Sequence, residues 1–163
     1  MVRYTKKYIN SMTVLVVCLS WFLAACDQKQ TTALYSSQIN TQQTMNWVLD
    51  PHADLIWDSS GFVVTAQGVQ NLAPSNDEEW DAVRTAAASI VEAGNLLIMP
   101  HHAQGRDAWI GHSRGLQFTG MELLKAAENR DAQALFDLGG QLYINCQSCH
   151  DQYLALAAQE RLN

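Results

Sequence analysis

Apolar side chains recur every three to four residues in four stretches of this 163-residue chain. That spacing places them on one face of a helix, so each stretch is predicted to be an amphipathic helix. No stretch alternates strictly between apolar and polar residues, as a half-buried strand would. The expected fold class is therefore all-α, an antiparallel four-helix bundle over residues 45–163. The predicted helices cover Met45 to about Gly61, Asn76 to Pro100, Asp107 to Asn129, and about Asp131 through Tyr153.

The ends of two helices can be read from local signals. Asn76 stands three residues before Glu79, an arrangement typical of a capped helix start. The first helix contains the pair Asp50-Pro51, which leaves two interpretations. Either Asp50 is an N-cap with Pro51 at the first helical position, or Pro51 kinks a helix that begins near Met45.

Two less regular stretches complete the pattern. The connection over 61–74 has enough apolar content that we expect it to lie against the bundle. Gly111, Gly115 and Gly120 interrupt the third helix, and each costs about 1 kcal/mol relative to Ala. We expect these glycines to mark close approach of another helix or of a bound cofactor.

The N-terminal segment has the composition of an export signal. Three basic residues precede an apolar run over about 12–25, and roughly fourteen apolar residues are too few to cross a bilayer. Residues 23–26 read Leu-Ala-Ala-Cys and resemble the lipobox of bacterial lipoproteins. The resemblance implies removal of residues 1–25 and a lipid on Cys26, whereas ordinary signal cleavage would leave that thiol free.

The lipobox resemblance also implies a location and a tether. Asp27 resembles the signal that keeps such lipoproteins in the inner membrane, so the expected place is the periplasm, anchored to that membrane. Residues 26–44 are rich in Gln, Thr and Ser, and we expect a flexible tether of about 20 to 25 Å between lipid and domain.

The charge balance limits the partners. After removal of residues 1–25, seven basic residues remain against sixteen acidic ones, a formal charge of −9. An acidic surface argues against nucleic acid. It either steers a redox partner protein with a basic face or simply keeps the domain soluble.

The chemistry is concentrated in residues 146–150, which read Cys-Gln-Ser-Cys-His. On a helix these two thiols and the imidazole, at positions i, i+3 and i+4, project from the same face. This C-x-x-C-H pattern is typical of covalent c-type haem attachment. The alternatives are a thioredoxin-like redox pair and a structural disulfide, but no β-α-β pattern accompanies the motif. With Cys18 in the signal and Cys26 lipidated, haem attachment accounts for every cysteine.

Residues 128–153, which contain this motif, resemble the last helix of the cytochrome c′ family, the class II c-type cytochromes. Members of that family are four-helix bundles with the haem motif near the C-terminus. Asp151 and Tyr153 match the acidic and aromatic residues that often follow the motif. The resemblance implies one covalent haem c, two thioether residues and a proximal iron ligand: Cys146, Cys149 and His150.

Function then depends on the sixth iron ligand. In the family, a low-spin branch of electron carriers uses a Met from the first helix, and a high-spin branch leaves the iron five-coordinate and binds NO or CO. Met45 is the candidate Met, and His52 lies two turns further along the same predicted helix. We expect an electron carrier. An enzyme is not expected, because no base and nucleophile pair accompanies the haem motif in the sequence. A gas-binding protein is the alternative, and a haem-bearing subunit of a membrane complex is a third interpretation.

Several further residues are candidates for secondary roles. Met99, His101 and His102, with His112, are a candidate copper site, although such a cluster is more often a solvated loop. A homodimer through the first two predicted helices is compatible with the pattern of apolar residues along the chain. Four tryptophans are expected in the core or against haem, and three arginines are candidates for the haem propionates: Trp47, Trp57, Trp80 and Trp109, with Arg84, Arg106 and Arg114.

Overall fold

A computed structural model of the chain describes residues 38–103 and 106–160, with side chains described as far as Leu154. The predicted signal peptide, the lipid site at Cys26 and most of the predicted tether lie outside the described residues. The described part is mostly helical, as the apolar pattern predicts, and it contains one two-stranded sheet. None of the helices in this part is both long and apolar enough to cross a membrane.

The first helical segment has three consecutive parts, α2 (Thr41–Thr44), the π-helix η1 (Met45–Leu49) and α3 (Asp50–Asp58). Asn40 caps it: its Oδ1 accepts a hydrogen bond from the Gln43 N–H at 2.9 Å, and the Gln43 Oε1 accepts one from the Asn40 N–H. The segment therefore begins four residues before the predicted domain start, and Thr44 is fully buried. The last part of the predicted tether is thus helical.

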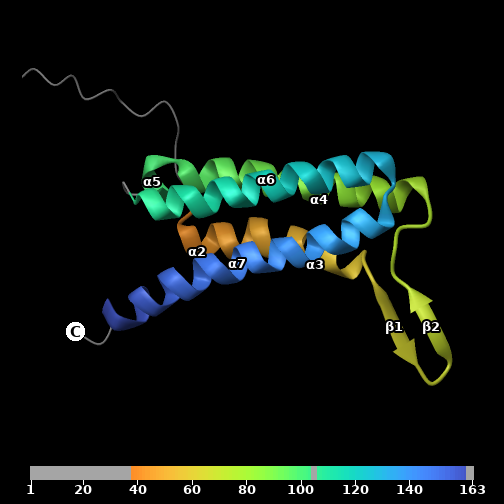
Figure 1. Cartoon of the computed structure of the whole chain (residues 1–163). Helices are drawn as coiled ribbons and strands as arrows, with labels where there is room; N and C mark the ends of the chain where they lie inside the picture. The colour runs from red at the N-terminus through yellow and green to blue at the C-terminus, as the bar shows by residue number, and fades with distance from the viewer. Residues whose placement is uncertain (1–37, 104–105, 161–163) are drawn as a thin grey trace, which may run out of the picture. The chain divides into compact units, whose positions relative to one another are not determined.

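The later helices are close to their predicted bounds: α4 covers Asp77–Ile98, the short α5 covers Pro100–Ala103, α6 covers Asp107–Asn129 and α7 covers Ala132–Glu160. Asn76 caps α4 as predicted, its Oδ1 accepting from the Glu79 N–H at 3.0 Å. α6 ends where Arg130 adopts a left-handed conformation with φ of 55°. Figure 1 shows α4 and α6 lying side by side, with the first helical segment and α7 across from them.

A β-hairpin stands where a connection packed against the helices was expected. β1 (Phe62–Thr65) pairs antiparallel with β2 (Gly68–Asn71), and all eight residues are exposed. The expectation that this connection packs against the helices was wrong. The segment contains β-branched residues, which favour strands, and it forms an exposed hairpin instead. Figure 1 shows it projecting away from the helices.

The core is formed by the inner faces of the long helices. Its fully buried large side chains come from α3, α4, α6 and α7: Ile56, Val83, Ile90, Leu123, Leu135 and Leu142. Of the three glycines in α6, Gly120 does mark close helix approach, because a Cβ there would lie 2.9 Å from Val91 Cγ2. A Cβ at Gly111 or Gly115 would meet no atom within 4 Å, so neither position requires a glycine for close helix packing.

Candidate cofactor-binding site

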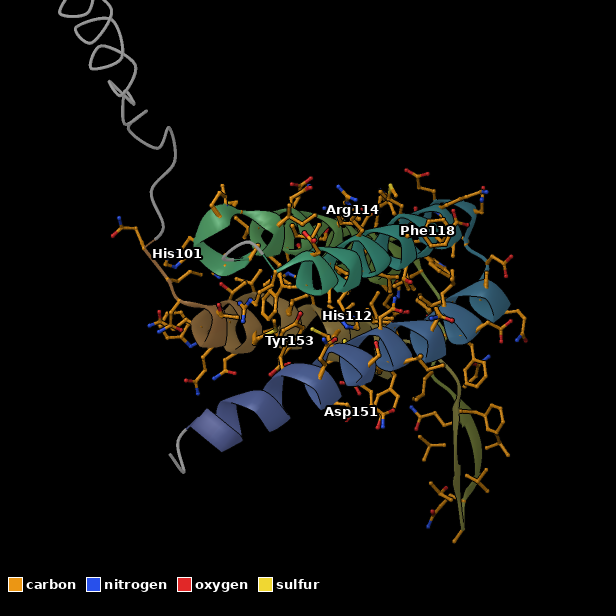
Figure 2. The ribbon with its side chains drawn as sticks, turned by 60° about the vertical axis from the view of Figure 1, so that its left-hand side comes forward. His101, His112, Arg114, Phe118, Asp151 and Tyr153 are labelled. Atoms are coloured by element: carbon orange, nitrogen blue, oxygen red, sulfur yellow. The ribbon has the colours of Figure 1, made fainter. Side chains whose placement is uncertain are left out.

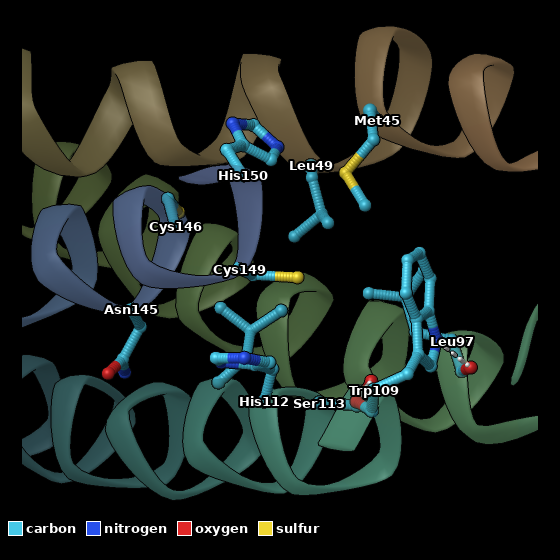
Figure 3. A pocket seen from close by; sticks show the side chains of 11 residues that line it. Met45, Leu49, Leu97, Trp109, His112, Ser113, Asn145, Cys146, Cys149 and His150 are labelled. Atoms are coloured by element: carbon cyan, nitrogen blue, oxygen red, sulfur yellow. Dashed lines mark hydrogen bonds between the residues drawn. The ribbon is translucent and has the colours of Figure 1, made fainter. Parts of the chain in front are cut away.

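One cavity brings together the residues that the sequence predicted to hold haem. Met45 from η1 and Cys146, Cys149 and His150 from α7 all line it (Figure 3). The rest of the lining is mainly apolar and comes from η1, α4, α6 and α7: Leu49, Leu97, Trp109, His112, Ser113, Leu116 and Asn145.

The position of the three motif residues follows from the apolar stripe of α7. Leu135 and Leu142 are fully buried and fix which face of α7 meets the core. Cys146 and Cys149 continue that stripe toward the C-terminal end, and both are half-buried. His150 lies at the edge of the same face and is exposed, so its imidazole lines the cavity from the solvent side.

Met45 reaches the cavity from an irregular turn. Pro51 has no N–H to donate to the carbonyl four residues earlier, and the helix changes its hydrogen-bond register just before it. The Asp50 N–H donates to the Met45 carbonyl, five residues back, which makes this turn a π-helix. Such turns occur frequently at functional sites. Of the two interpretations of Pro51, the structure supports a disturbed continuous helix that starts earlier.

Burial beside the cavity raises the pKa of both thiols of the motif. Burial raises the pKa of Cys146, and the nearby Cys149 and Asp50 raise it further. Burial also raises the pKa of Cys149, although the charge of Arg106 opposes that change. In the structure both side chains are free thiols rather than a disulfide. Both thiols are therefore neutral at ordinary pH.

The size of the cavity tests the fit of a porphyrin. Its volume is about 40 Å³, room for roughly three or four water-sized spheres. The donor set therefore suits haem, but the cavity is smaller than a porphyrin. α7 packs mainly on α6 and only lightly on α3.

An arginine is fixed at one end of the cavity wall. The Arg106 guanidinium lies 4.6 Å from the Trp109 ring centre and 5.2 Å from that of Tyr153. It donates to the backbone carbonyls of His102 at 2.7 Å and Ala103 at 3.1 Å. No carboxylate within the described ranges forms an ion pair with it. Arg106 is therefore a preorganised cation without a carboxylate partner in that part of the chain.

The other two candidate arginines lie elsewhere. Arg84 forms an ion pair with Asp81 at 2.7 Å, one turn away on α4. Arg114 is exposed on α6 and does not line the cavity. Of the three candidates for the propionates, only Arg106 is beside the cavity wall.

Two polar residues of the cavity were not predicted to lie at the haem site, although His112 was a candidate for a copper site. His112 Nε2 donates to Gln152 Oε1 at 2.9 Å, and Figure 2 shows His112 near Tyr153 of α7. The Asn145 amide donates to Thr119 Oγ1 at 2.6 Å and to the Gly115 carbonyl at 3.2 Å. Both residues join α6 to α7. The signal for His112 was present, since it falls on the apolar stripe of the third predicted helix.

Several predicted residues lie away from the cavity. His52 Nδ1 donates to the Val48 carbonyl at 2.6 Å and does not line the cavity. His102 is buried, and its Nδ1 lies 3.0 Å from Thr41 Oγ1 in a hydrogen bond. The pKa of its imidazole is lowered mainly by burial and less by the charge of His101. Within the described ranges no three His, Cys, Asp or Glu side chains gather to hold a metal ion, so the predicted copper cluster is not assembled.

The four tryptophans divide between core and surface. Trp80 and Trp109 are buried, and the Trp109 Nε1–H donates to the Leu97 carbonyl at 2.8 Å. Trp57 is half-buried and donates to the Gly139 carbonyl on α7 at 2.9 Å. Trp47 is 61% exposed, so its expected place in the core was wrong. Trp47 is two residues from both Met45 and Leu49, so on a helix it falls on the face opposite to them.

Comparison with models of known protein families finds no match, and comparisons with curated proteins and with solved structures find none either.

Proposed function

We propose that this chain is an exported c-type haem protein that carries single electrons. The observation that supports it most is the convergence of Met45, Cys146, Cys149 and His150 on one cavity, from elements about a hundred residues apart in the chain. The C-x-x-C-H spacing predicted three of these residues and the first helix the fourth. A chance C-x-x-C-H on a surface would not meet a methionine across an apolar cavity.

The proposal gives each of these residues a role. Cys146 and Cys149 hold one haem through thioether bonds, His150 is the proximal ligand and Met45 is the sixth ligand. The bound haem supplies a one-electron Fe(III)/Fe(II) couple, and imidazole with thioether ligation favours the ferrous form. Trp109 and the apolar residues around it exclude water.

Arg106 and Asn145 orient the cofactor in this proposal. Arg106 offers a fixed cation to the haem carboxylates, since guanidinium matches carboxylate in geometry and charge. Asn145 is held by Thr119 and Gly115, and it joins α6 to the helix that carries the motif. Neither residue exchanges protons or electrons itself.

The finer architecture and the location belong to the same proposal. The helices form an antiparallel four-helix bundle of the cytochrome c′ kind, and the haem would be held by residues of α7 and η1. Export and lipidation at Cys26 place the domain in the periplasm, anchored to the inner membrane. A redox partner protein, alone or within a membrane complex, docks transiently on the acidic surface.

Leu49 supports a second candidate function. It lines the same cavity one turn from Met45 and is almost fully buried. If Leu49 rather than Met45 covers the iron, the sixth position stays open and the protein binds NO or CO.

Absorption spectra of the purified protein distinguish the two functions. We expect a low-spin spectrum with a Met-to-iron charge-transfer band in the oxidised form, and little or no CO binding in the reduced form. Met45→Ala should abolish that band and open the iron to CO. The matched control is Met121→Ala, because Met121 is half-exposed on α6 and lies away from the cavity. A high-spin spectrum with ready CO binding in the unchanged protein would overturn the electron carrier and favour gas binding.

A further inference from the structure

The β-hairpin is the most exposed apolar element among the described residues. Phe62, Val64 and Val69 are 68%, 70% and 70% exposed. Cross-strand pairing puts Val64 opposite Val69 and Phe62 opposite Asn71, so the three apolar side chains share one face. Val63 is on the other face and is 43% exposed.

The hairpin has too little support from its own helices. No third strand pairs with it among the residues that the structure describes, and Figures 1 and 2 show it projecting from the helices. An isolated two-stranded hairpin is marginally stable in water, and exposed apolar strands with free edges tend to associate. A covering partner would stabilise this element.

A cleft lies between the apolar face of the hairpin and the start of α7. Phe62 and Val69 line one side, and Phe136 of α7 lines the other. Its volume is about 370 Å³, and none of its lining residues is charged. The hairpin and its flanks are also free of charge, since no Asp, Glu, Lys, Arg or His occurs over residues 59–76.

We propose that a second copy of this chain occupies the cleft, so that two hairpins clasp each other about a twofold axis. Apolar side chains of each hairpin fill the cleft of the other copy. The faces with Phe62, Val64 and Val69 then stack on each other. The molecule provides both the projecting apolar element and the apolar cleft, which is the self-complementarity that a twofold interface requires.

Charge and shape favour this occupant over others. Two copies of an acidic chain repel each other, so they associate best where neither presents a charge, and the hairpin with its cleft is such a place. A lipid surface would reach the hairpin tip, which is Ala66-Gln67, but not the apolar side chains that face α7. This dimer differs from one formed through the first two helices.

Sedimentation equilibrium of the intact purified protein, in detergent matched to the solvent density, tests the proposal. We expect a reversible dimer. Val64→Asp should weaken it by about 100-fold or more, because a carboxylate buried between two hairpins has no partner. The matched control is Phe118→Asp. Phe118 is 63% exposed on α6, outside the hairpin and its cleft, so this variant should still dimerise.

Hydrogen exchange over residues 62–71 provides a second readout that does not depend on any variant. We expect protection to increase with protein concentration as the hairpins pair. A chain that stays monomeric, or a dimer lost in Phe118→Asp but kept in Val64→Asp, would overturn the proposal. Protection that arises only when phosphatidylcholine vesicles are added would also overturn it and would favour a lipid surface as occupant.

Discussion

The two helix seams of the domain are packed very differently. Between α4 and α6 the backbones approach closely: a Cβ at Gly94 would lie 2.5 Å from Gln117 Cγ, and one at Gly120 would lie 2.9 Å from Val91 Cγ2. Between the first helical segment and α7 a Cβ at Gly139 would meet only ordinary contacts, the nearest 3.5 Å from Ser60 Oγ. The cavity with Met45 and the C-x-x-C-H motif lies on this second, looser side.

The two seams therefore have different roles: the one between α4 and α6 supports the fold, and the other contains the candidate site. A close-packed seam resists rearrangement, because well-packed interiors leave no space into which side chains can move. A seam that contains a cavity and a π-helix costs less to open. We infer that the contact between α4 and α6 contributes most of the stability of the domain, and that the side with the cavity contributes less.

The largest expected contrast comes from one substitution made in each seam of the haem-free chain. Leu123 on α6 is fully buried, so Leu123→Ala should lower the free energy of unfolding by about 3–5 kcal/mol. Leu49 already borders a cavity, and Leu49→Ala should cost only about 1–2 kcal/mol, below the usual range for a closed core. Urea unfolding followed by circular dichroism measures both values. Equal losses would show that the two seams are packed alike.

A smaller contrast is expected between two glycines. Gly120→Ala should cost about 1–3 kcal/mol, because its Cβ would overlap Val91 on the neighbouring helix. Gly140 of α7 has open space around it, so Gly140→Ala should stabilise the helix by up to about 1 kcal/mol. Thermal unfolding of the two variants compares them directly. A stabilised Gly120→Ala would mean that α4 and α6 are not in close contact.

The smallest effect concerns pH and is confined to the reduced, haem-free chain. Burial raises the pKa of both Cys146 and Cys149 above the ordinary 9.0, so the folded state retains protons that the unfolded state has released. Stability should be constant below that ordinary pKa and should fall as pH rises above it, because only the unfolded chain then releases the thiol protons readily.

Replacement of one thiol isolates this pH effect from other titrations. Cys146→Ser should remove about half of the slope of unfolding free energy against pH. If the slope is unchanged, or if the unchanged chain becomes more stable at alkaline pH, the thiols do not lie in an apolar cavity.

The regular part of the fold followed from local rules. The period of the apolar residues located the three later helices, and the cap at Asn76 gave the start of α4, because these signals act over only a few residues. The α7 stripe predicted the buried Leu135 and Leu142 and the common face of the motif.

The irregular parts needed information that the apolar pattern does not contain. The hairpin was missed because its faces are both exposed, so no buried face imposes strict alternation. The π-helix before Pro51 depends on a backbone hydrogen bond that spans five residues, and the apolar pattern does not show it. The approach of Arg106 to Trp109 and Tyr153 is a tertiary contact, and composition alone did not distinguish it from Arg84 or Arg114.

The central claim is that residues 146–150 bind haem covalently at this cavity, and the intact mass of the exported, denatured protein tests it most directly. We expect the chain to retain the mass of one haem after denaturation, and the double variant Cys146→Ser with Cys149→Ser to lose it. A denatured chain without haem, with Cys146 and Cys149 as free thiols or joined in a disulfide, would contradict the account.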